Sequence, residues 1–312
     1  MPDIRIRDVS PRLALQAQPA TTAQKVELVD RLTTAGITAV EVSSFVRPDL
    51  VPGLADAAEV FSRVQRPAGV SLECCVGNLT GLKRAIDAGA HAAWFLLSVD
   101  EGFSANNTGR STEDSLAVLE QMRAVAAGSG TRLGTYLIFA WGGPVGLPRR
   151  PDDLKPVLDR LLDLEVPDWI LADSSGYASP LQVHDTVAFA AALSSMEALT
   201  VQIHDSRGMG VANVAELARM GLRNIDTSLT GAGGHPAVPG APVGGVCTED
   251  AVQTLELMGY PTGVDLPALI ETANWFDGIL GGHENGFVRR MGAVPRSATD
   301  ADPRRGTFSW SQ

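Results

Sequence analysis

The sequence predicts an α/β fold, a (β/α)8 TIM barrel with a C-terminal helical extension. Short apolar runs alternate eight times with amphipathic helical patterns over about 260 residues, which is the usual length of such a barrel. Helical connections between successive strands require those strands to be parallel. A doubly wound open sheet is the alternative, but no G-x-G-x-x-G motif follows the first predicted strand. The barrel is therefore the preferred fold.

The eight predicted strands are short and rich in apolar residues. They span residues 4–9, 39–42, 70–76, 92–97, 133–140, 169–172, 199–204 and 224–229. In the seventh, Val201 and Ile203 alternate with Gln202 and His204 before the chain becomes polar at Asp205. Such an alternation is typical of a strand with one buried face and one face that carries chemistry.

The predicted helices lie between these strands. The first begins with the capping-box spacing Thr21-x-x-Gln24 and ends at Gly36. The others span residues 54–64, 79–88, 112–127, 152–164, 180–193, 211–220 and 249–258, and several end next to a glycine. One more helix is predicted at residues 266–280, after the eighth unit. It could cover the barrel or pack against a second copy of the chain, so a homodimer is left open.

Composition limits the domain organisation and the partners. With 312 residues, 45% of them hydrophobic and 20% charged, we expect a single domain over residues 1–293 and a poorly ordered tail over residues 294–312. A formal net charge of −11 argues against nucleic-acid and anionic-membrane partners. No apolar run reaches transmembrane length and no secretory pattern is present, so a cytoplasmic location is expected. The three cysteines fit neither a disulfide framework nor a zinc site.

Ionisable side chains follow or end four of the predicted strands. They are Arg12 after the first, Glu41 on the second, Asp173 after the sixth and His204 on the seventh. Catalytic groups of such barrels sit where strands end, so these four are expected to meet at one mouth. Together they can bind a carboxylate or a thioester carbonyl, stabilise an enolate and move a proton.

Each of these residues also has a structural interpretation. Arg12 and Glu41 could simply form an ion pair, Asp173 could close an Asx-turn or cap a helix, and His204 could be a buried, hydrogen-bonded histidine. Their convergence at four strand ends favours a functional site.

Several segments carry a resemblance to a known family. They are Ser10-Pro11-Arg12 with Leu15-Gln16, Glu41-x-Ser43-Ser44-Phe45-Val46, Asn78-Leu79-x-Gly81, Ala88-Gly89-Ala90, His204-Asp205-x-x-Gly208 with Ala212-Asn213, Gly231-x-Gly233-Gly234 and Thr248-Glu249-Asp250. In this order the chain resembles the hydroxymethylglutaryl-CoA lyase branch of the DRE-TIM metallolyases. The resemblance spans nearly the whole predicted barrel.

The resemblance implies a barrel that cleaves a 3-hydroxyacyl-CoA in a retro-Claisen-type reaction with a divalent cation. The family holds this cation with an Asp directly after the motif Arg, a His-x-His pair on the seventh strand and an Asn after the eighth. Here those positions carry Leu13, Gln202 with His204, and Gly244-Gly245-Val246, so only His204 remains. A hard cation needs several oxygen ligands, and we therefore expect neither a metal nor another cofactor. A rearranged transition-metal site of His204 and His235 stays open.

The glycine-rich loop after the eighth strand departs from the family in a second way. His235 stands where the resembled lyases carry a catalytic Cys. Such a His could transfer a proton or replace part of the electrostatic effect of the cation, or it could be an exposed loop residue with no role. Gln202 would donate a hydrogen bond where the cation polarises an oxygen.

Further departures concern the substrate. In the loop over residues 98–107, Ala105 and Asn106 replace lysines that are common in the family, which weakens the case for CoA phosphates at this rim. Trp141 could narrow the mouth or stack on a flat ligand, or it could be a packed loop aromatic. The substrate-binding candidates are Gln202, Ser43, Asn78, Tyr136 and Trp141.

Three functions are compatible with these features. The preferred one is a metal-independent carbon–carbon lyase or aldolase-type enzyme acting on a small carbonyl or acyl-thioester substrate. Arg12, His204, His235, Asp173 and Glu41 are its catalytic candidates. The alternatives are a hydrolase, isomerase or cyclase that uses the same enolate-stabilising mouth, and a binding protein without catalysis.

Overall fold

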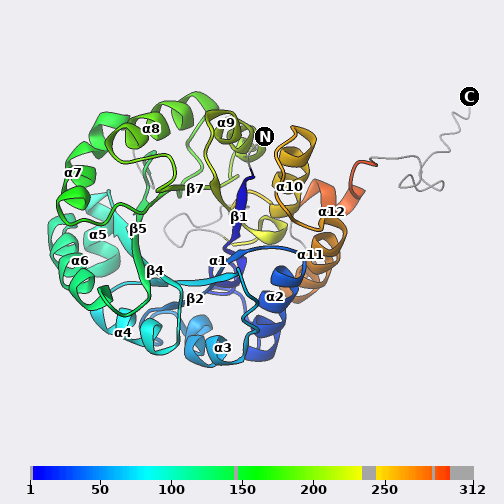
Figure 1. Cartoon of the computed structure of the whole chain (residues 1–312), viewed down its shortest axis with the longest axis horizontal. Coiled ribbons are helices and arrows are strands. Elements are labelled where there is room, and N and C mark those ends of the chain that lie inside the picture. The colour runs from blue at the N-terminus through cyan, green and yellow to red at the C-terminus, as the bar shows by residue number, and fades with distance from the viewer. Residues whose placement is uncertain (1–2, 144–146, 234–243, 283–284, 296–312) are drawn as a thin grey trace, which may run out of the picture.

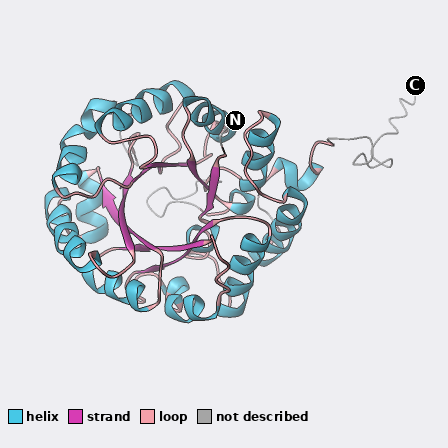
Figure 2. Cartoon of the chain, viewed as in Figure 1, coloured by secondary structure: helices cyan, strands magenta, loops and turns pink. Residues whose placement is uncertain are grey.

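The computed structural model describes residues 3–143, 147–233, 244–282 and 285–295. They form a closed barrel of eight parallel strands in sequence order, surrounded by helices (Figures 1 and 2). This confirms the predicted (β/α)8 fold. The residues of the predicted tail beyond 295 lie outside the described part of the chain. Near its start, Val294 N–H donates to Gln253 Oε1 at 2.7 Å.

The strands of the barrel are short, as the apolar runs predict. They are β1 (Arg5–Asp8), β2 (Ala39–Phe45), β3 (Ser71–Val76), β4 (Ala92–Ser98), β5 (Arg132–Ile138), β6 (Trp169–Asp173), β7 (Leu199–Ile203) and β8 (Asn224–Thr227). β1 pairs with β8 in parallel, with Arg7 opposite Asp226, and this pairing closes the barrel.

The helices of the units pack outside these strands, and further helices follow the eighth. They are α1 (Ser10–Leu13), α2 (Thr22–Thr34), α3 (Ala57–Arg63), α4 (Leu79–Asp87), α5 (Glu101–Thr108), α6 (Thr112–Ala126), α7 (Lys155–Asp163), α8 (Pro180–Leu193), α9 (Gly210–Met220), α10 (Thr248–Leu257), α11 (Leu266–Leu280) and α12 (Phe287–Met291), with 3-10 turns at Pro52–Leu54, Pro151–Leu154 and Leu229–Gly231. The predicted helix at residues 266–280 is α11, which lies beside α2 and α10 (Figure 1). No helix in the described ranges is long and apolar enough to cross a membrane.

Two local predictions were wrong. The segment over residues 98–107 was expected to be a loop, but most of it forms α5. The side chain of Asp100 caps this helix by accepting the N–H of Phe103 at 2.7 Å. β5 was expected to reach residue 140, but it ends at Ile138 because Phe139 adopts a left-handed conformation with φ of +64°.

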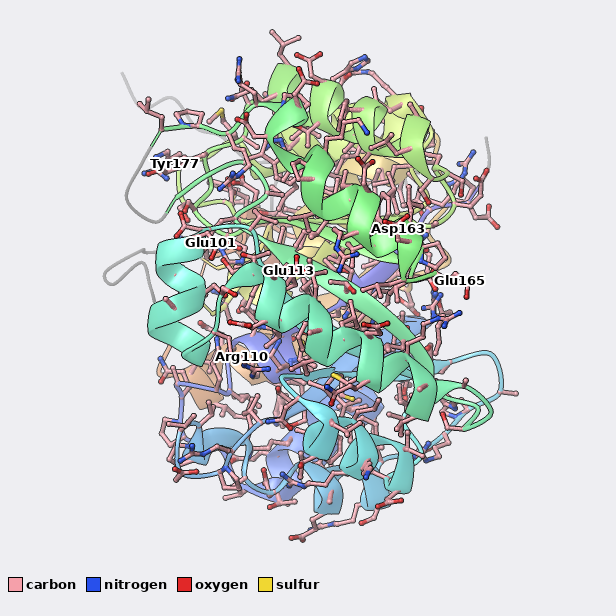
Figure 3. The ribbon with its side chains drawn as sticks, turned by 90° about the vertical axis from the view of Figure 1, so that its left-hand side faces the viewer. Glu101, Arg110, Glu113, Asp163, Glu165 and Tyr177 are labelled. Carbon is pink, nitrogen blue, oxygen red and sulfur yellow. The ribbon has the colours of Figure 1, made fainter. Side chains whose placement is uncertain are left out.

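The two ends of the barrel differ in what they carry. In Figure 3, Glu101 at the start of α5 and Tyr177 in the loop after β6 lie at one end. Asp163 at the end of α7 and Glu165 just after it lie at the other. The first end is where the strands finish. We call it the mouth, because functional groups of (β/α)8 barrels gather there.

The interior of the barrel is divided into two halves. The apolar half comes from β3 to β6 and the residue after β5, and consists of Cys75, Ala92, Trp94, Tyr136, Ile138, Phe139, Ile170 and Ala172. The polar half comes from β1, β2, β3, β7 and β8 and consists of Arg7, Glu41, Glu73, Gln202 and Asp226. A separate, larger apolar cluster fills the space between the sheet and the helices.

Arg7 is the centre of the polar half. Its guanidinium donates from Nη2 to Glu41 Oε1 at 2.5 Å, from Nε to Glu73 Oε2 at 2.8 Å and from Nη1 to Asp226 Oδ2 at 2.5 Å. Nη1 also lies 3.1 Å from the hydroxyl of Tyr136. All of these side chains are buried, so Arg7 is a cation shared by three carboxylates from three other strands.

Arg7→Leu is expected to destabilise the fold by about 3–5 kcal/mol, because it leaves three buried carboxylates without their shared cation. Urea unfolding followed by circular dichroism measures this loss. Arg132→Gln is the matched control. Arg132 also contacts Glu73, at 3.8 Å, but its side chain is 46% exposed, so its loss should cost less than about 1 kcal/mol. Equal effects of the two substitutions would show that Arg7 does not have this role.

Candidate active site

Arg12 reaches the mouth through the short helix α1, which follows β1 directly. The carboxylate of Asp8 fixes this turn by accepting the N–H of Ser10 at 2.9 Å and its hydroxyl at 2.5 Å. The other oxygen of Asp8 accepts the hydroxyl of Thr248 at 2.6 Å, which ties the turn to the start of α10. The turn that carries Arg12 is therefore held by contacts between segments 240 residues apart in the sequence.

The side chain of Arg12 is held from one side only. Its Nε donates to Glu41 Oε2 at 2.5 Å, and its guanidinium carbon lies 5.7 Å from the centre of the Tyr136 ring. Within the described residues, no hydrogen bond engages its Nη1 or Nη2, and 12% of the side chain is exposed. These two groups are available to a ligand in the fork geometry that suits a carboxylate or an oxyanion.

Glu41 connects Arg12 to the polar half. Its Oε1 accepts the hydroxyl of Tyr136 at 3.0 Å and the thiol of Cys75 at 3.2 Å, besides Arg7. Burial alone would raise the pKa of Glu41, but the charges of Arg12 and Arg7 more than offset this and lower it. Glu41 is therefore an ionised carboxylate that fixes Arg12, which favours an orienting role over proton transfer.

Gln202 and Asp226 complete the floor below the mouth. Gln202 Nε2 donates to the hydroxyl of Tyr136 at 3.2 Å and lies 3.4 Å from Asp226 Oδ2, which also accepts from Tyr136 at 2.9 Å. Burial raises the pKa of Asp226 to about 6 against the opposite effect of Arg7. The structure thus brings the predicted residues Gln202, Tyr136, Glu41 and Arg12 into one connected group.

Sequence reasoning missed Arg7, Glu73 and Asp226. Ionisable groups were considered at strand ends, whereas these three residues lie within β1, β3 and β8. Arg7 alternates with Ile6, and Glu73 with Leu72 and Cys74. In a closed barrel covered by helices, the side chains on both faces of a strand are buried. The outer face packs in the apolar cluster under the helices, so a charged residue in the middle of a strand is expected to face the barrel interior. This signal could have identified them.

His204 lies just after β7, at the mouth. It is paired in an antiparallel bridge with Gly245, while Val246 N–H donates to Ile203 O at 2.8 Å and Asp205 N–H to Gly244 O at 3.0 Å. The described end of the glycine-rich loop is therefore joined to the strand end that carries His204. His235, on the same loop, lies outside the described residues.

The carboxylate of Asp173 is engaged by the loop that follows β6. Its two oxygens accept the N–H groups of Tyr177 at 2.8 Å and Ala178 at 3.1 Å. Burial raises the pKa of Asp173 to about 6 against the effect of these hydrogen bonds. This is the turn-forming arrangement considered as the alternative, and it gives Asp173 a role in shaping the rim.

Three other predicted residues have structural contacts of different kinds. Ser43 is buried on β2, next to a register shift that follows Glu41. Asn78 caps α4 by accepting the N–H of Gly81 at 2.9 Å. Trp141 does not line the mouth as predicted, because its indole is fully buried in the cluster between sheet and helices and donates to Gln182 O at 3.1 Å.

The residues present do not fit the cation of the resembled lyases. Leu13 is buried, and its Cγ lies only 2.6 Å from where a Cβ at Gly233 would stand, so an apolar side chain packs here against the glycine-rich loop. Gln202 is turned toward Tyr136 and Asp226, and Gly245 has no side chain to offer. The described part of the chain contains no group of three or more His, Cys, Asp or Glu side chains that could hold a metal ion.

Comparison with known proteins gives consistent matches over most of the chain. The model of the HMGL-like family matches residues 3–275. The hydroxymethylglutaryl-CoA lyase YngG of Bacillus subtilis is 30% identical, covering 89% of this chain and 93% of that protein. The (R)-citramalyl-CoA lyase of Chloroflexus aurantiacus is also 30% identical, covering 94% and 96%.

A solved structure extends this similarity to the backbone. An HMG-CoA lyase from Acinetobacter baumannii, in complex with coenzyme A and 3-methylmalate, is 31% identical with a TM-score of 0.90, covering 95% of this chain and 97% of that one. The family match, the sequence relatives and the shared barrel agree, and the chain belongs to the HMGL-like family.

Proposed function

We propose that the protein is a carbon–carbon lyase that cleaves a hydroxy-acyl or related carbonyl substrate without a divalent cation. The observation that supports this proposal most directly is that the guanidinium of Arg12 is hydrogen-bonded within the described residues through Nε only. Glu41 holds its Nε, and both Nη groups remain for a carbonyl or carboxylate oxygen. The relatives named for hydroxymethylglutaryl-CoA and (R)-citramalyl-CoA support the reaction type and an acyl-CoA as the first substrate class to test.

The reaction begins with removal of the proton from the 3-hydroxyl group of the substrate. The C2–C3 bond then breaks, C3 becomes a carbonyl carbon, and the electron pair passes through C2 to the C1 oxygen as an enolate. Protonation of C2 gives the second product. Arg12 stabilises the charge that develops on the C1 oxygen, because its fork of donors is permanently charged and already oriented.

Proton transfer is assigned to His204 and His235. An imidazole can accept and return a proton near neutral pH, and His204 is held at the strand end beside the base of the loop that carries His235. Glu41 acts by orienting Arg12, and Asp173 acts by shaping the loop after β6 at the rim of the mouth. Gln202 provides an amide next to the hydroxyl of Tyr136.

Arg12→Lys is expected to lower kcat/KM by about 100–1000-fold with the fold intact, because a point ammonium cannot donate a fork of hydrogen bonds. Cleavage of hydroxymethylglutaryl-CoA and citramalyl-CoA, with products identified by mass spectrometry, provides the assay. Arg84→Lys is the matched control, since Arg84 lies on α4 and its guanidinium packs over Phe45, which belongs to the cluster between the sheet and the helices. Near-normal turnover of Arg12→Lys would make Arg12 structural, and products with an unchanged carbon count would replace the lyase by a hydrolase or isomerase.

His204→Ala is expected to lower kcat by about 100-fold or more, and to remove a limb of the pH–rate profile between about pH 5.5 and 7.5. His184→Ala is the control, because that histidine pairs with Glu216 on the outer helices at 2.8 Å. If the limb persists in the His204 variant, the titrating group is a different one and His204 leaves the mechanism.

Chelation is expected to leave activity unchanged, because Leu13 and Gly245 offer no donor and the amide of Gln202 is engaged with Tyr136 and Asp226. The purified protein should contain only traces of Mg²⁺, Mn²⁺ and Zn²⁺ by elemental analysis. Turnover is measured before and after dialysis against EDTA, with re-addition of each cation as a control. A content near one ion per chain, or activity restored by one of these cations, would contradict this part of the proposal.

A further inference from the structure

We propose that the edge of the apolar half at the mouth, where Leu96 and Phe103 are only partly buried, is a substrate subsite. In this arrangement it receives an alkyl or aryl group that the substrate carries beside the oxygen bound by Arg12. The inference rests on the proposed function, and it narrows the substrate class to acyl compounds with an apolar substituent. The residues that would determine this specificity are Leu96, Ile138 and Phe103.

Leu96 shows that the apolar half reaches the mouth. On β4, Ala92 and Trp94 belong to the interior cluster, whereas Phe95 and Leu97 belong to the cluster under the helices. By this alternation Leu96 points into the barrel, as Ala92 and Trp94 do, but unlike Trp94 it is only partly buried. An inward side chain of a closed barrel can meet solvent only through an end, and Leu96 is two residues from the end of β4 at the mouth.

The residue after β5 adds an aromatic ring to this surface. Ile138 and Phe139 are consecutive, yet both belong to the interior cluster, because the left-handed φ of Phe139 breaks the alternation of the strand. Non-glycine residues keep this conformation only where their surroundings hold them, and such positions gather at functional sites. The ring of Phe139 packs edge-to-face against Phe103 of α5, with centroids 5.0 Å apart.

The mouth is therefore bordered by ionisable side chains on one side and apolar side chains on the other. Arg12 and His204 come from the side of β1 and β7, and Leu96, Ile138 and Phe103 come from β4, β5 and α5. A ligand with an anionic or carbonyl end and an apolar end can meet both sides. A wholly polar ligand would leave the apolar residues against polar atoms or water, which is unfavourable.

The test uses straight-chain monocarboxylates from acetate to hexanoate, with binding measured by isothermal titration calorimetry. The subsite predicts that affinity for the wild-type protein rises by about two- to four-fold for each added methylene group, at one molecule per chain. This readout needs neither turnover nor knowledge of the natural substrate.

Variants of the protein test separately how the carboxylate and the alkyl chain of the ligand contribute to binding. Leu96→Ala is expected to reduce the gain per methylene, whereas Leu97→Ala, on the neighbouring outward position, should leave that gain unchanged even though it opens a cavity under the helices. Arg12→Gln should weaken the binding of every carboxylate by a similar factor and preserve the gain per methylene. Binding stoichiometry and circular dichroism report the folded fraction of each variant.

The outcomes distinguish this inference from the proposed function. An affinity that does not change with chain length, while Arg12→Gln still weakens binding, would overturn the apolar subsite and leave the role of Arg12 intact. A gain with chain length that Leu96→Ala reduces would support the subsite, even if Arg12→Gln had no effect and the proposed role of Arg12 failed. Absence of binding throughout the series would contradict both.

Discussion

The contact of one buried guanidinium with three carboxylates is the constraint on which the polar half of this barrel depends. Arg7 is joined to β2, β3 and β8 through Glu41, Glu73 and Asp226. Because Oε1 of Glu41 is committed to Arg7, only Oε2 remains for Arg12. The orientation of Arg12 at the mouth therefore depends on Arg7, which is buried inside the barrel.

This dependence explains what the sequence could and could not predict. The fold followed from the spacing of apolar runs, since each βα unit leaves a periodic pattern in its own segment. Arg12 and Gln202 were found because they lie after or near a strand end, and Glu41 because its strand was expected to end at residue 42, although β2 runs to Phe45. Arg7 and Asp226 were missed because they lie within strands, away from the strand ends where ionisable groups were sought, and the contacts that join them come from strands far apart in the chain.

Other differences between the sequence predictions and the structure arose from the direction in which a side chain points. Asp173 and Asn78 lie at strand ends, as functional residues do, but their oxygens accept backbone N–H groups of the next turn. Trp141 follows β5 closely, yet its ring packs toward α8. Position along the chain predicts the end of the barrel at which a residue lies. It does not distinguish a residue that faces a ligand from one that completes the loop.

The packing of Leu13 against the glycine-rich loop limits which side chains this part of the mouth can accept. Gly233 has φ of +112°, and the side chain of Leu13 fills the space beside it. An acidic residue in place of Leu13 would bury a charge against that loop, and Gly245 would still offer no side chain beside it. An engineered Leu13→Asp would therefore lose packing and gain an unfavourable charge before any cation could offset either cost. Engineering of a metal site at this mouth would have to rebuild the packing of the glycine-rich loop together with the ligands.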